Sequence, residues 1–579
     1  MHGFFGTYGV KVCWDVSRLG KHLIRREYSD GVFSLLQLTH EKFLNDKVWY
    51  DSDEVFIATE GVLLNSDELR DAYGEKDLGA LLCNLYRQKG AEMITNLRGS
   101  FAGVIYDKRK QQCAVFNDQI GSRILYVCRY DAGIVWASDL SVLQDVVEAG
   151  PSHSFAASMI TYGYSPIGET PVNGVVRIGA GHMISMRNGE AKDVCYHRFE
   201  RRATVRKDMR QYVEEFDVLF CRAVERILKK NKEYGLLNYM PLSAGLDSRM
   251  TVMAAHRLTT GKITNFTYSQ SGYYDETIPR HIARELGNDW LFHKLDGGDY
   301  LKNFEKYLAE TDGLIQFSGA AQVDQMVHLL PTKNIGVIAT GMLGDIVANA
   351  YSKGDGKIIN GEGALSKKLS GLLSVSELEQ LPKTWSDREL YYLYVRGFNC
   401  ANLGGPIVFQ QFTESFSPFC DVDVVQYCFC MPQDVRWNYN FYDEWVKRCY
   451  PQACKWLHNG VQRIGHRGRL VEIAGRQMLL KDVPKRVVMK LLRDVGAADL
   501  YTETSGGSMN PEDSWLKENN ELRECFDNYY AANKYKLLVW QDVYHGAEWL
   551  YENGTANEKM QVLTLLAAIG RYEVKESEG

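Results

Sequence analysis

Ser243-Ala244-Gly245-Leu246-Asp247-Ser248 is the stretch that decides the fold, because an apolar run at 236–242 precedes it and a helical pattern at 248–258 follows it. A strand, a tight turn of small residues and a helix start bring backbone N–H groups and a hydroxyl to the positive end of a helix dipole, which favours phosphate groups. The turn has neither the lysine of a Walker A loop nor the three glycines of a dinucleotide-binding fingerprint. The alternative interpretation is an ordinary strand-to-helix connection whose Ser and Asp cap the helix.

The residues after this turn alternate between apolar strands and amphipathic helices. Strands are predicted at 262–269, 290–295 and 335–340, and a helix is predicted at 276–286. This alternation predicts a parallel, doubly wound sheet, whose ligands lie beyond the carboxyl ends of the strands.

Two acidic residues follow neighbouring strands of this predicted sheet. Asp247 belongs to the turn, and Asp345 ends the stretch Thr340-Gly341-Met342-Leu343-Gly344-Asp345, which overlaps the end of the strand at 335–340. Because Mg²⁺ prefers oxygen ligands, two carboxylates at adjacent strand ends predict a magnesium site shared with nucleotide phosphates. The alternative is that each acid only caps a helix.

Length, charge and cysteine content limit the class of protein. At 579 residues the chain is longer than one core usually spans, so two domains and a helical appendage are expected. Its net charge of -6 gives no reason to expect a nucleic-acid partner. There is no signal-like N-terminal segment and no run of about twenty apolar residues, so we expect a cytoplasmic protein without an integral membrane span. The 13 cysteines lack a zinc-type double C-x-x-C pattern and are expected to be reduced thiols.

The front half of the chain has short alternating strands separated by turn residues. Strands are predicted at 55–59, 101–106, 113–117, 124–128, 134–138 and 182–186. Turns such as Asp131-Ala132-Gly133 are typical of antiparallel sheets, so an α+β unit is predicted ahead of the parallel-sheet domain.

The order of these motifs resembles that of the asparagine synthetase family, which includes β-lactam synthetase and lasso-peptide cyclase. The turn at 243–248 is similar to the S-G-G-x-D-S pyrophosphate loop of ATP pyrophosphatases, with Ala244 at the first of the two glycines. Glu414-Ser415-Phe416-Ser417-Pro418-Phe419-Cys420-Asp421 is similar to the family's E-A-R-V-P-F-L-D run. In the front half the resemblance rests on Asn96-Leu97-Arg98-Gly99-Ser100-Phe101-Ala102, Asn117-Asp118-Gln119-Ile120-Gly121, Ala137-Ser138-Asp139-Leu140 and Gly174-Val175-Val176-Arg177.

The resemblance implies a two-domain architecture. Residues 1–203 would form an antiparallel-sheet sandwich of the N-terminal-nucleophile glutaminase type, which is a glutamine amidotransferase-like domain. Residues 204–579 would form an α/β ATP-pyrophosphatase domain with a parallel doubly wound sheet and a helical C-terminal part.

The front domain departs from the family at the residues that hydrolyse glutamine. The family's nucleophile is a cysteine at position 2, and this chain has His2, which has no thiol to form a thioester. The family's N-G-E run aligns with Glu60-Gly61-Val62, and the aspartate that holds the substrate's amine aligns with Arg98. Asn65 and Gly99 are retained. We therefore expect a front domain without glutaminase activity; the alternative is that His2 acts as an unusual general base.

For the back domain the resemblance implies ATP and Mg²⁺, with a carboxylate converted to an acyl-adenylate that ammonia or an amine then attacks. Asp247 and Asp345 would be the metal ligands and would act in catalysis. The nucleotide-binding residues implied by the family are Leu242, Ser243, Gly245, Asp247, Ser248, Phe266, Tyr268, Ser269, Thr340 and Gly341.

Other positions depart from asparagine synthetase itself. Met342 replaces a glutamate associated with amide formation, and Glu414 is a candidate to orient or deprotonate the amine. The alternative for Glu414 is a buried ion pair. No lysine aligns with the family's adenylation lysine, and Arg463 or Arg467 is the candidate substitute. The basic segment 463–493 is predicted to be a solvated amphipathic face, with docking of an anionic partner as the alternative.

Together these features predict an ATP-dependent, AMP- and pyrophosphate-forming amide synthetase. Its substrates would be a small-molecule, peptide or sugar carboxylate and ammonia or an amine, and a homodimer is compatible with the sequence. Two alternatives stay open: a glutamine-hydrolysing asparagine synthetase that tolerates His2, and a non-catalytic descendant that binds nucleotide.

Overall fold

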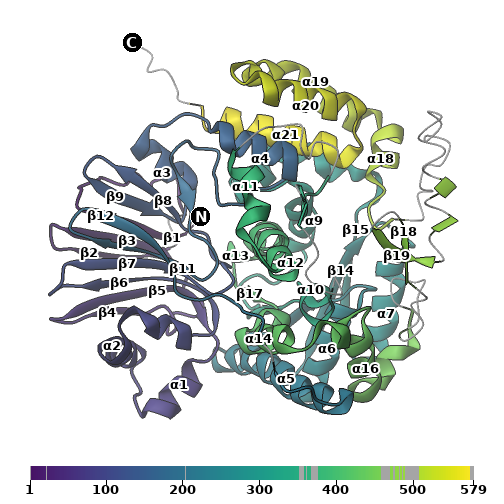
Figure 1. The fold of residues 1–579 in the computed structure, drawn as a ribbon, viewed down its shortest axis with the longest axis horizontal. Coiled ribbons are helices and arrows are strands. Elements are labelled where there is room, and N and C mark those ends of the chain that lie inside the picture. The colour runs from purple at the N-terminus through teal and green to yellow at the C-terminus, as the bar shows by residue number, and fades with distance from the viewer. Residues whose placement is uncertain are drawn as a thin grey trace.

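The computed structural model describes residues 2–20, 23–202, 204–350, 358–359, 361–366, 376–457, 464, 470–473, 476–480, 483–484, 487–488 and 508–573. Figure 1 shows an antiparallel-sheet domain on the left and a larger domain of helices around a parallel sheet on the right. This confirms the predicted order, with the antiparallel sandwich ahead of the parallel doubly wound domain and its helical C-terminal part.

The front domain consists of two six-stranded antiparallel sheets. The first has the strand order β10-β8-β9-β1-β3-β2 and the second has the order β12-β11-β7-β6-β5-β4. The strands are β1 (Gly3–Tyr8), β2 (Ile24–Ser29), β3 (Phe33–Thr39), β4 (Trp49–Asp51), β5 (Val55–Leu63), β6 (Gly99–Asp107), β7 (Gln112–Asn117), β8 (Tyr126–Tyr130), β9 (Gly133–Ala137), β10 (Val176–Arg177), β11 (His182–Arg187) and β12 (Glu190–Cys195).

The six strands predicted for the front half are confirmed, and β1 to β4, β10 and β12 were missed. β2 is an edge strand whose residues alternate between half-buried and exposed, and its sequence Ile-Arg-Arg-Glu-Tyr-Ser is too polar to read as a strand. β1 is fully buried but carries two glycines, Gly3 and Gly6, and glycine is depleted in strands.

The second sheet is covered on both faces. Along β6, Ala102, Val104 and Tyr106 face the first sheet, while Phe101 and Ile105 face α1 (Ser66–Tyr73) and α2 (Leu78–Lys89). This period of two, with apolar residues at both sets of positions, is what a strand buried on both faces requires.

The back domain is built on a parallel sheet. β13 (Asn238–Pro241), β14 (Ile263–Ser269) and β15 (Asp289–Lys294) are paired in parallel, as are β16 (Ile338–Ala339) and β17 (Ser415–Phe416). A parallel bridge between Leu237 and Ile335 joins the two groups. The spatial order is therefore β15-β14-β13-β16-β17, and the direction of winding reverses between β13 and β16.

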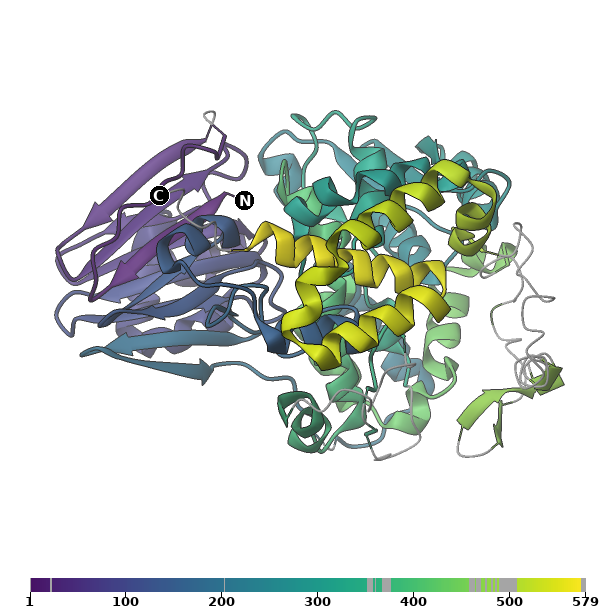
Figure 2. The same cartoon turned by 90° about the horizontal axis from the view of Figure 1, so that it is seen from above.

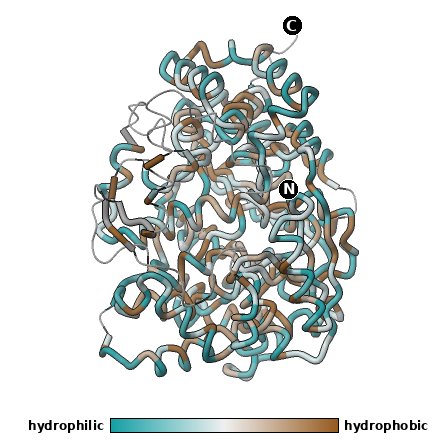
Figure 3. Tube along the Cα trace, turned by 90° about the vertical axis from the view of Figure 1, so that its right-hand side faces the viewer, coloured by the Kyte–Doolittle hydropathy of each residue, from teal (hydrophilic) through white to brown (hydrophobic). Residues whose placement is uncertain are grey.

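The helices of this domain follow the predicted pattern. They include α5 (Met209–Glu233), α6 (Leu246–Leu258) and α7 (Tyr274–Leu286). Figure 3 shows hydrophilic and hydrophobic residues alternating along the helices at the margin of the molecule, as amphipathic helices require. Within the described part of the chain, none of the helices combines the length and apolar character that crossing a membrane would require.

A C-terminal helical layer contacts both domains. It comprises α18 (Glu512–Glu518), α19 (Asn520–Asn533), α20 (Gln541–Asn553) and α21 (Ala556–Arg571), drawn in yellow in Figure 2. α21 is docked on α4 (His153–Tyr162) of the front part of the chain, where Gln561 Nε2 donates to the carbonyls of Met159 (2.6 Å) and Ile160 (2.8 Å).

Four buried charged side chains join the two domains, and we call them the interdomain charge cluster: Lys47, Glu60, Arg123 and Glu414. Lys47 Nζ lies 3.3 Å from Glu60 Oε1, and Arg123 of the front domain donates to Glu414 of the back domain. Each of the four side chains is at most 6% exposed. Buried charges are tolerated only when they are paired. Removing one of these side chains would therefore leave its partner as an unpaired buried charge.

We predict that Arg123→Ala destabilises the protein by about 3–5 kcal/mol, because it leaves Glu414 buried without its partner. The measurement is the urea unfolding midpoint followed by circular dichroism. Arg210→Ala is the matched control: Arg210 forms an exposed pair with Glu214 on α5, and its removal should leave the midpoint unchanged. Equal midpoints for both variants would contradict the role of the charge cluster.

Candidate functional site

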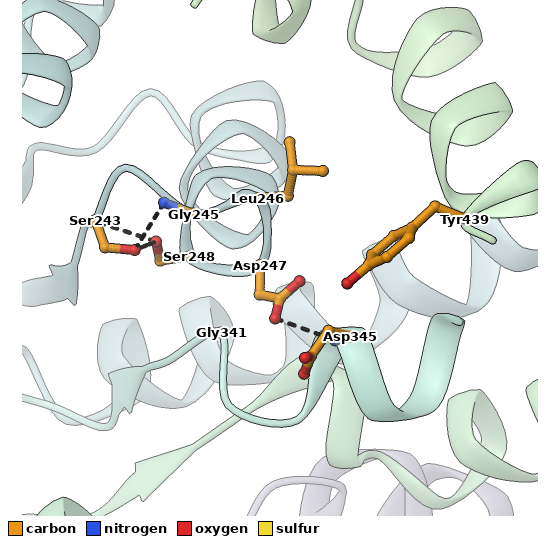
Figure 4. A pocket seen from close by; sticks show the side chains of 8 residues that line it. All are labelled: Ser243, Gly245, Leu246, Asp247, Ser248, Gly341, Asp345 and Tyr439. Atoms are coloured by element: carbon orange, nitrogen blue, oxygen red, sulfur yellow. Dashed lines mark hydrogen bonds between the residues drawn. The ribbon is translucent and has the colours of Figure 1, made fainter. Parts of the chain in front are cut away.

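The candidate site lies where the winding of the parallel sheet reverses. The turn at 243–248 follows β13, and the stretch 340–345 follows β16, so both leave the carboxyl ends of the two central strands. In open α/β sheets, ligands bind in the crevice at such a reversal. A cavity of about 370 Å³ is present there, lined by Ser243, Gly245, Leu246, Asp247, Ser248, Gly341, Asp345 and Tyr439 (Figure 4).

The turn is held closed by its own hydroxyl groups. The N–H of Ser243 donates to Ser248 Oγ (2.9 Å), the two serine hydroxyls are 2.9 Å apart, and the N–H of Gly245 donates to Ser243 Oγ (3.2 Å). α6 starts at Leu246, within this turn. The positive end of a 13-residue helix and two hydroxyls therefore meet at the cavity, which is a suitable environment for an anion.

Ala244 fits the turn without crowding it. Its methyl group is buried in the hydrophobic core, and its N–H donates to Asp275 Oδ1 (2.7 Å). Asp275 lies in the first turn of α7, and its side chain anchors the turn at 243–248, which we call the phosphate-type turn. Burial raises the pKa of Asp275.

Asp247 is bound through both of its carboxylate oxygens. Tyr442 on α16 (Asn440–Cys449) donates its hydroxyl to Oδ1 (2.7 Å), and the N–H of Asp345 donates to Oδ2 (3.1 Å). Burial, and then the charge of Asp247, raises the pKa of Tyr442, so the phenol stays protonated and continues to donate. One carboxylate thus links α6, α10 (Gly344–Ala348) and α16.

Two glycines allow the strand ends to approach this closely. A Cβ atom on Gly341 would lie 2.3 Å from the backbone nitrogen of Ser248, and a Cβ atom on Gly344 would lie 2.6 Å from Asp247 Cγ. Neither gap can hold a carbon atom. A side chain at either position would push Asp345 away from Asp247.

Tyr439 forms the opposite wall of the cavity, and no sequence motif predicted it. Its backbone is left-handed (φ 61°), an uncommon conformation for a bulky residue, and its N–H donates to Asn349 Oδ1 (2.8 Å). Its ring is stacked on Tyr442 with 6.1 Å between the centroids. In Figure 4 the hydroxyl of Tyr439 points toward Asp247 and Asp345.

Six of the predicted site residues line the cavity: Ser243, Gly245, Asp247, Ser248, Gly341 and Asp345. The other predicted nucleotide-binding residues, Leu242, Phe266, Tyr268, Ser269 and Thr340, lie at the ends of the central strands but are not among its lining residues. The side chains of Phe266 and Ser269 are fully buried, because central parallel strands are covered on both faces. Burial raises the pKa of Tyr268 to about 12.

The structure does not place Glu414 among the residues that line the cavity, and its catalytic role stays a prediction. Its side chain turns toward the front domain, where it accepts from Arg123 and from Ser100 Oγ (3.4 Å). The buried ion pair, which was the alternative, is what the structure contains. Arg463 and Arg467 lie outside the described residues, so the replacement for the family lysine stays a prediction.

The two carboxylates fit a magnesium ion that shares its ligands with a nucleotide. No group of three or more His, Cys, Asp or Glu side chains suited to a metal ion occurs among the described residues. A protein site with only two carboxylates suits Mg²⁺, which usually keeps waters and takes its remaining ligands from phosphates.

In the front domain, the space beside His2, where the family resemblance implies a glutamine site, is filled by protein side chains. His2 Nε2 lies 3.8 Å from Glu60 Oε1, and the ring of His2 is 4.3 Å from that of His40. Burial, and then the charge of Arg123, lowers the pKa of His2. The cavity that remains beside His2, Glu60 and Arg123 is about 10 Å³, which holds at most one water molecule.

Comparison with known proteins agrees with this architecture. The family model for a glutamine amidotransferase domain matches residues 47–199, and the model for asparagine synthase matches residues 215–391. Asparagine synthetase (glutamine-hydrolyzing) 2 of Bacillus subtilis (strain 168) is 23% identical over 239 residues, covering 36% of this chain and 31% of its own length. Asparagine synthetase B (glutamine-hydrolyzing) of Escherichia coli (strain K12) is 27% identical over 326 residues, covering 51% and 52%.

The matches span only part of these relatives, from about a third to about half of their length. Among solved structures, glutamine phosphoribosylpyrophosphate amidotransferase of B. subtilis, complexed with ADP and GMP, is 11% identical and covers 57% of this chain and 94% of its own. Its TM-score of 0.26 is too low to support an argument. The two domain models in this order, with asparagine synthetases as relatives, make the chain a member of the asparagine synthetase family.

Proposed function

We propose that this protein is an ATP-dependent amide synthetase that forms AMP and pyrophosphate. It would adenylate a carboxylate and transfer the acyl group to ammonia or to a substrate amine. The observation that carries the proposal is the cavity at the reversal of the sheet, where the phosphate-type turn, Asp247 and Asp345 face one space and the backbone N–H of Asp345 donates to the carboxylate of Asp247.

Each lining group has a role in this reaction. The hydroxyls of Ser243 and Ser248 and the N-terminus of α6 would hold the pyrophosphate as it leaves. Asp247 and Asp345 would hold Mg²⁺, which when bound offsets the negative charge of the phosphates. Tyr439 would donate its hydroxyl to a phosphate oxygen, since it points toward the two acids (Figure 4). Tyr442 would act as a positioning residue for Asp247.

The nitrogen would come from free ammonia or from an amine on the substrate. Glutamine does not fit beside His2, where the remaining cavity is about 10 Å³. We propose residues 1–203 as a glutamine amidotransferase-like scaffold without hydrolytic activity and residues 204–579 as the synthetase. The segment between β12, which ends at Cys195, and α5, which begins at Met209, supports this division.

We predict that Mg-ATP, ammonium and a panel of carboxylates yield pyrophosphate, and that Asp247→Ala abolishes its release. Tyr442→Phe should lower the rate roughly 10- to 100-fold, the loss expected for one hydrogen bond to a charged group. Tyr551→Phe is the matched control, because it removes a similar Tyr–Asp bond (2.9 Å to Asp527) from the C-terminal helices. If no carboxylate supports release while Mg-ATP still binds, the protein is a nucleotide-binding descendant instead.

Gly341→Ala should abolish binding of Mg-ATP, because the added methyl group would collide with the backbone of the phosphate-type turn. The measurement is the rise in Tm that saturating Mg-ATP produces. Gly319→Ala on α9 (Ser318–Val327) is the control, since a methyl group there meets nothing within 4 Å. That variant should keep the full ligand-induced rise and match or exceed the parent Tm. An unchanged rise for Gly341→Ala would place the nucleotide elsewhere.

Incubation with glutamine should release no glutamate above background at any pH from 6 to 9. The low pKa of His2 keeps its imidazole neutral in this range, but the filled pocket leaves no room for the substrate. His2→Cys restores the family's nucleophile but frees only the volume of the imidazole beside Glu60 and Arg123, which is less than a glutamine needs, so it should stay inactive too. Glutamate formation by the parent protein would revive the glutamine-hydrolysing alternative.

A further inference from the structure

At the open end of the β11–β12 hairpin, away from its turn, a thiol, an imidazole and a carboxylate lie together, outside the site described above. Cys195 pairs directly with His182 across the two antiparallel strands, and Asp193 lies two residues before Cys195 on the same face. Asp193 Oδ1 lies 2.7 Å from His182 Nδ1. A carboxylate therefore orients the ring, and the ring faces the thiol.

The charges around Cys195 favour its thiolate. The hydrogen bond to Asp193, followed by that to Cys195, raises the pKa of His182 to about 9. The hydrogen bond from His182 lowers the pKa of Cys195, and the nearby charge of Arg198 adds to this. Buried thiols such as Cys113 and Cys428 show the opposite, because burial raises their pKa. An electropositive, accessible environment is the usual setting of a reactive cysteine.

The cluster is open to solvent and is not a metal site. Cys195 is exposed, β12 is the edge strand of its sheet, and the side chain of Asp193 is 61% exposed. Among the described residues, no group of three His, Cys, Asp or Glu is arranged to hold a metal ion. With a metal site excluded for these residues, the chemistry that suits a thiol beside a protonated imidazole is nucleophilic attack.

We propose that Cys195, activated by His182 and Asp193, is a reactive thiolate that forms mixed disulfides with low-molecular-weight disulfides. The sulfur of Cys195 attacks one sulfur of R–S–S–R, so one S–S bond forms and one breaks. Cys195 is oxidised, the disulfide is reduced, and R–S⁻ leaves. The proton on His182 is available to the departing thiolate.

The test compares thiols within one sample of the full-length protein. Iodoacetamide, and in a second series oxidised glutathione, is added at pH 6.0 and at pH 8.5, and peptide mass spectrometry gives the rate at each cysteine. At pH 6.0 an ordinary thiol is well under 1% thiolate. Cys195 should react about tenfold faster than the exposed Cys13, after allowance for the lower nucleophilicity of an acidic thiol.

Variants separate activation from simple exposure. His182→Gln should reduce the rate at Cys195 to that of Cys13 at pH 6.0, and Asp193→Asn should give an intermediate rate. His153→Gln is the matched control, because it removes a similar His–Asp pair (3.1 Å to Asp542) elsewhere on the surface. It should leave the rate at Cys195 unchanged.

Slow reaction of the buried Cys113 in each variant verifies that the front domain is still folded. The proposal is overturned if Cys195 and Cys13 react equally at pH 6.0 in the parent protein. It is also overturned if a folded His182→Gln variant retains the fast rate, or if oxidised glutathione adds to Cys13 as readily as to Cys195.

Discussion

The carboxylate of Asp247 is the group on which the arrangement of the candidate site depends. One oxygen accepts from Tyr442 and the other from the backbone of Asp345, so three helices that are distant in sequence meet at one side chain. Partners on both oxygens fix the carboxylate before any ligand arrives, and such preorganisation is what electrostatic stabilisation requires. Gly341 and Gly344 make the contact possible, since any side chain would separate these elements.

The parts of this site that local sequence determines were predictable. The strand-turn-helix pattern around residues 243–248 predicted β13 and α6. The alternation of apolar strands and amphipathic helices after it predicted β14, α7 and β15. Tyr442 was not predictable, because its partner Asp247 is 195 residues away and no local pattern links the two. Tyr439 was missed for a related reason: its N–H donates to Asn349, which is 90 residues away, and no local pattern marks its left-handed backbone.

Glu414 shows the limit of motif matching. Its motif aligns well with the family's, and the backbone behaves accordingly, since the carbonyl of Glu414 accepts from Ile338 (2.8 Å) beside the central strand β16. The side chain of Glu414, however, turns toward the positively charged side chain of Arg123. Arg123 lies in the front domain and pairs with it, so the direction of a carboxylate was decided by a partner that the motif does not include.

The same pair also ties the front domain to the back domain. Glu60 stands where the family has a neutral residue, and its negative charge is matched by Lys47, while Arg123 carries the pairing across to Glu414. A second contact is made by α21, whose Gln561 donates to two carbonyls of α4. Removing the front domain would therefore expose Glu414 and remove the contact of α21 with α4, while the contacts of α21 with α18, α19 and α20 would stay. These contacts hold the front and back domains together.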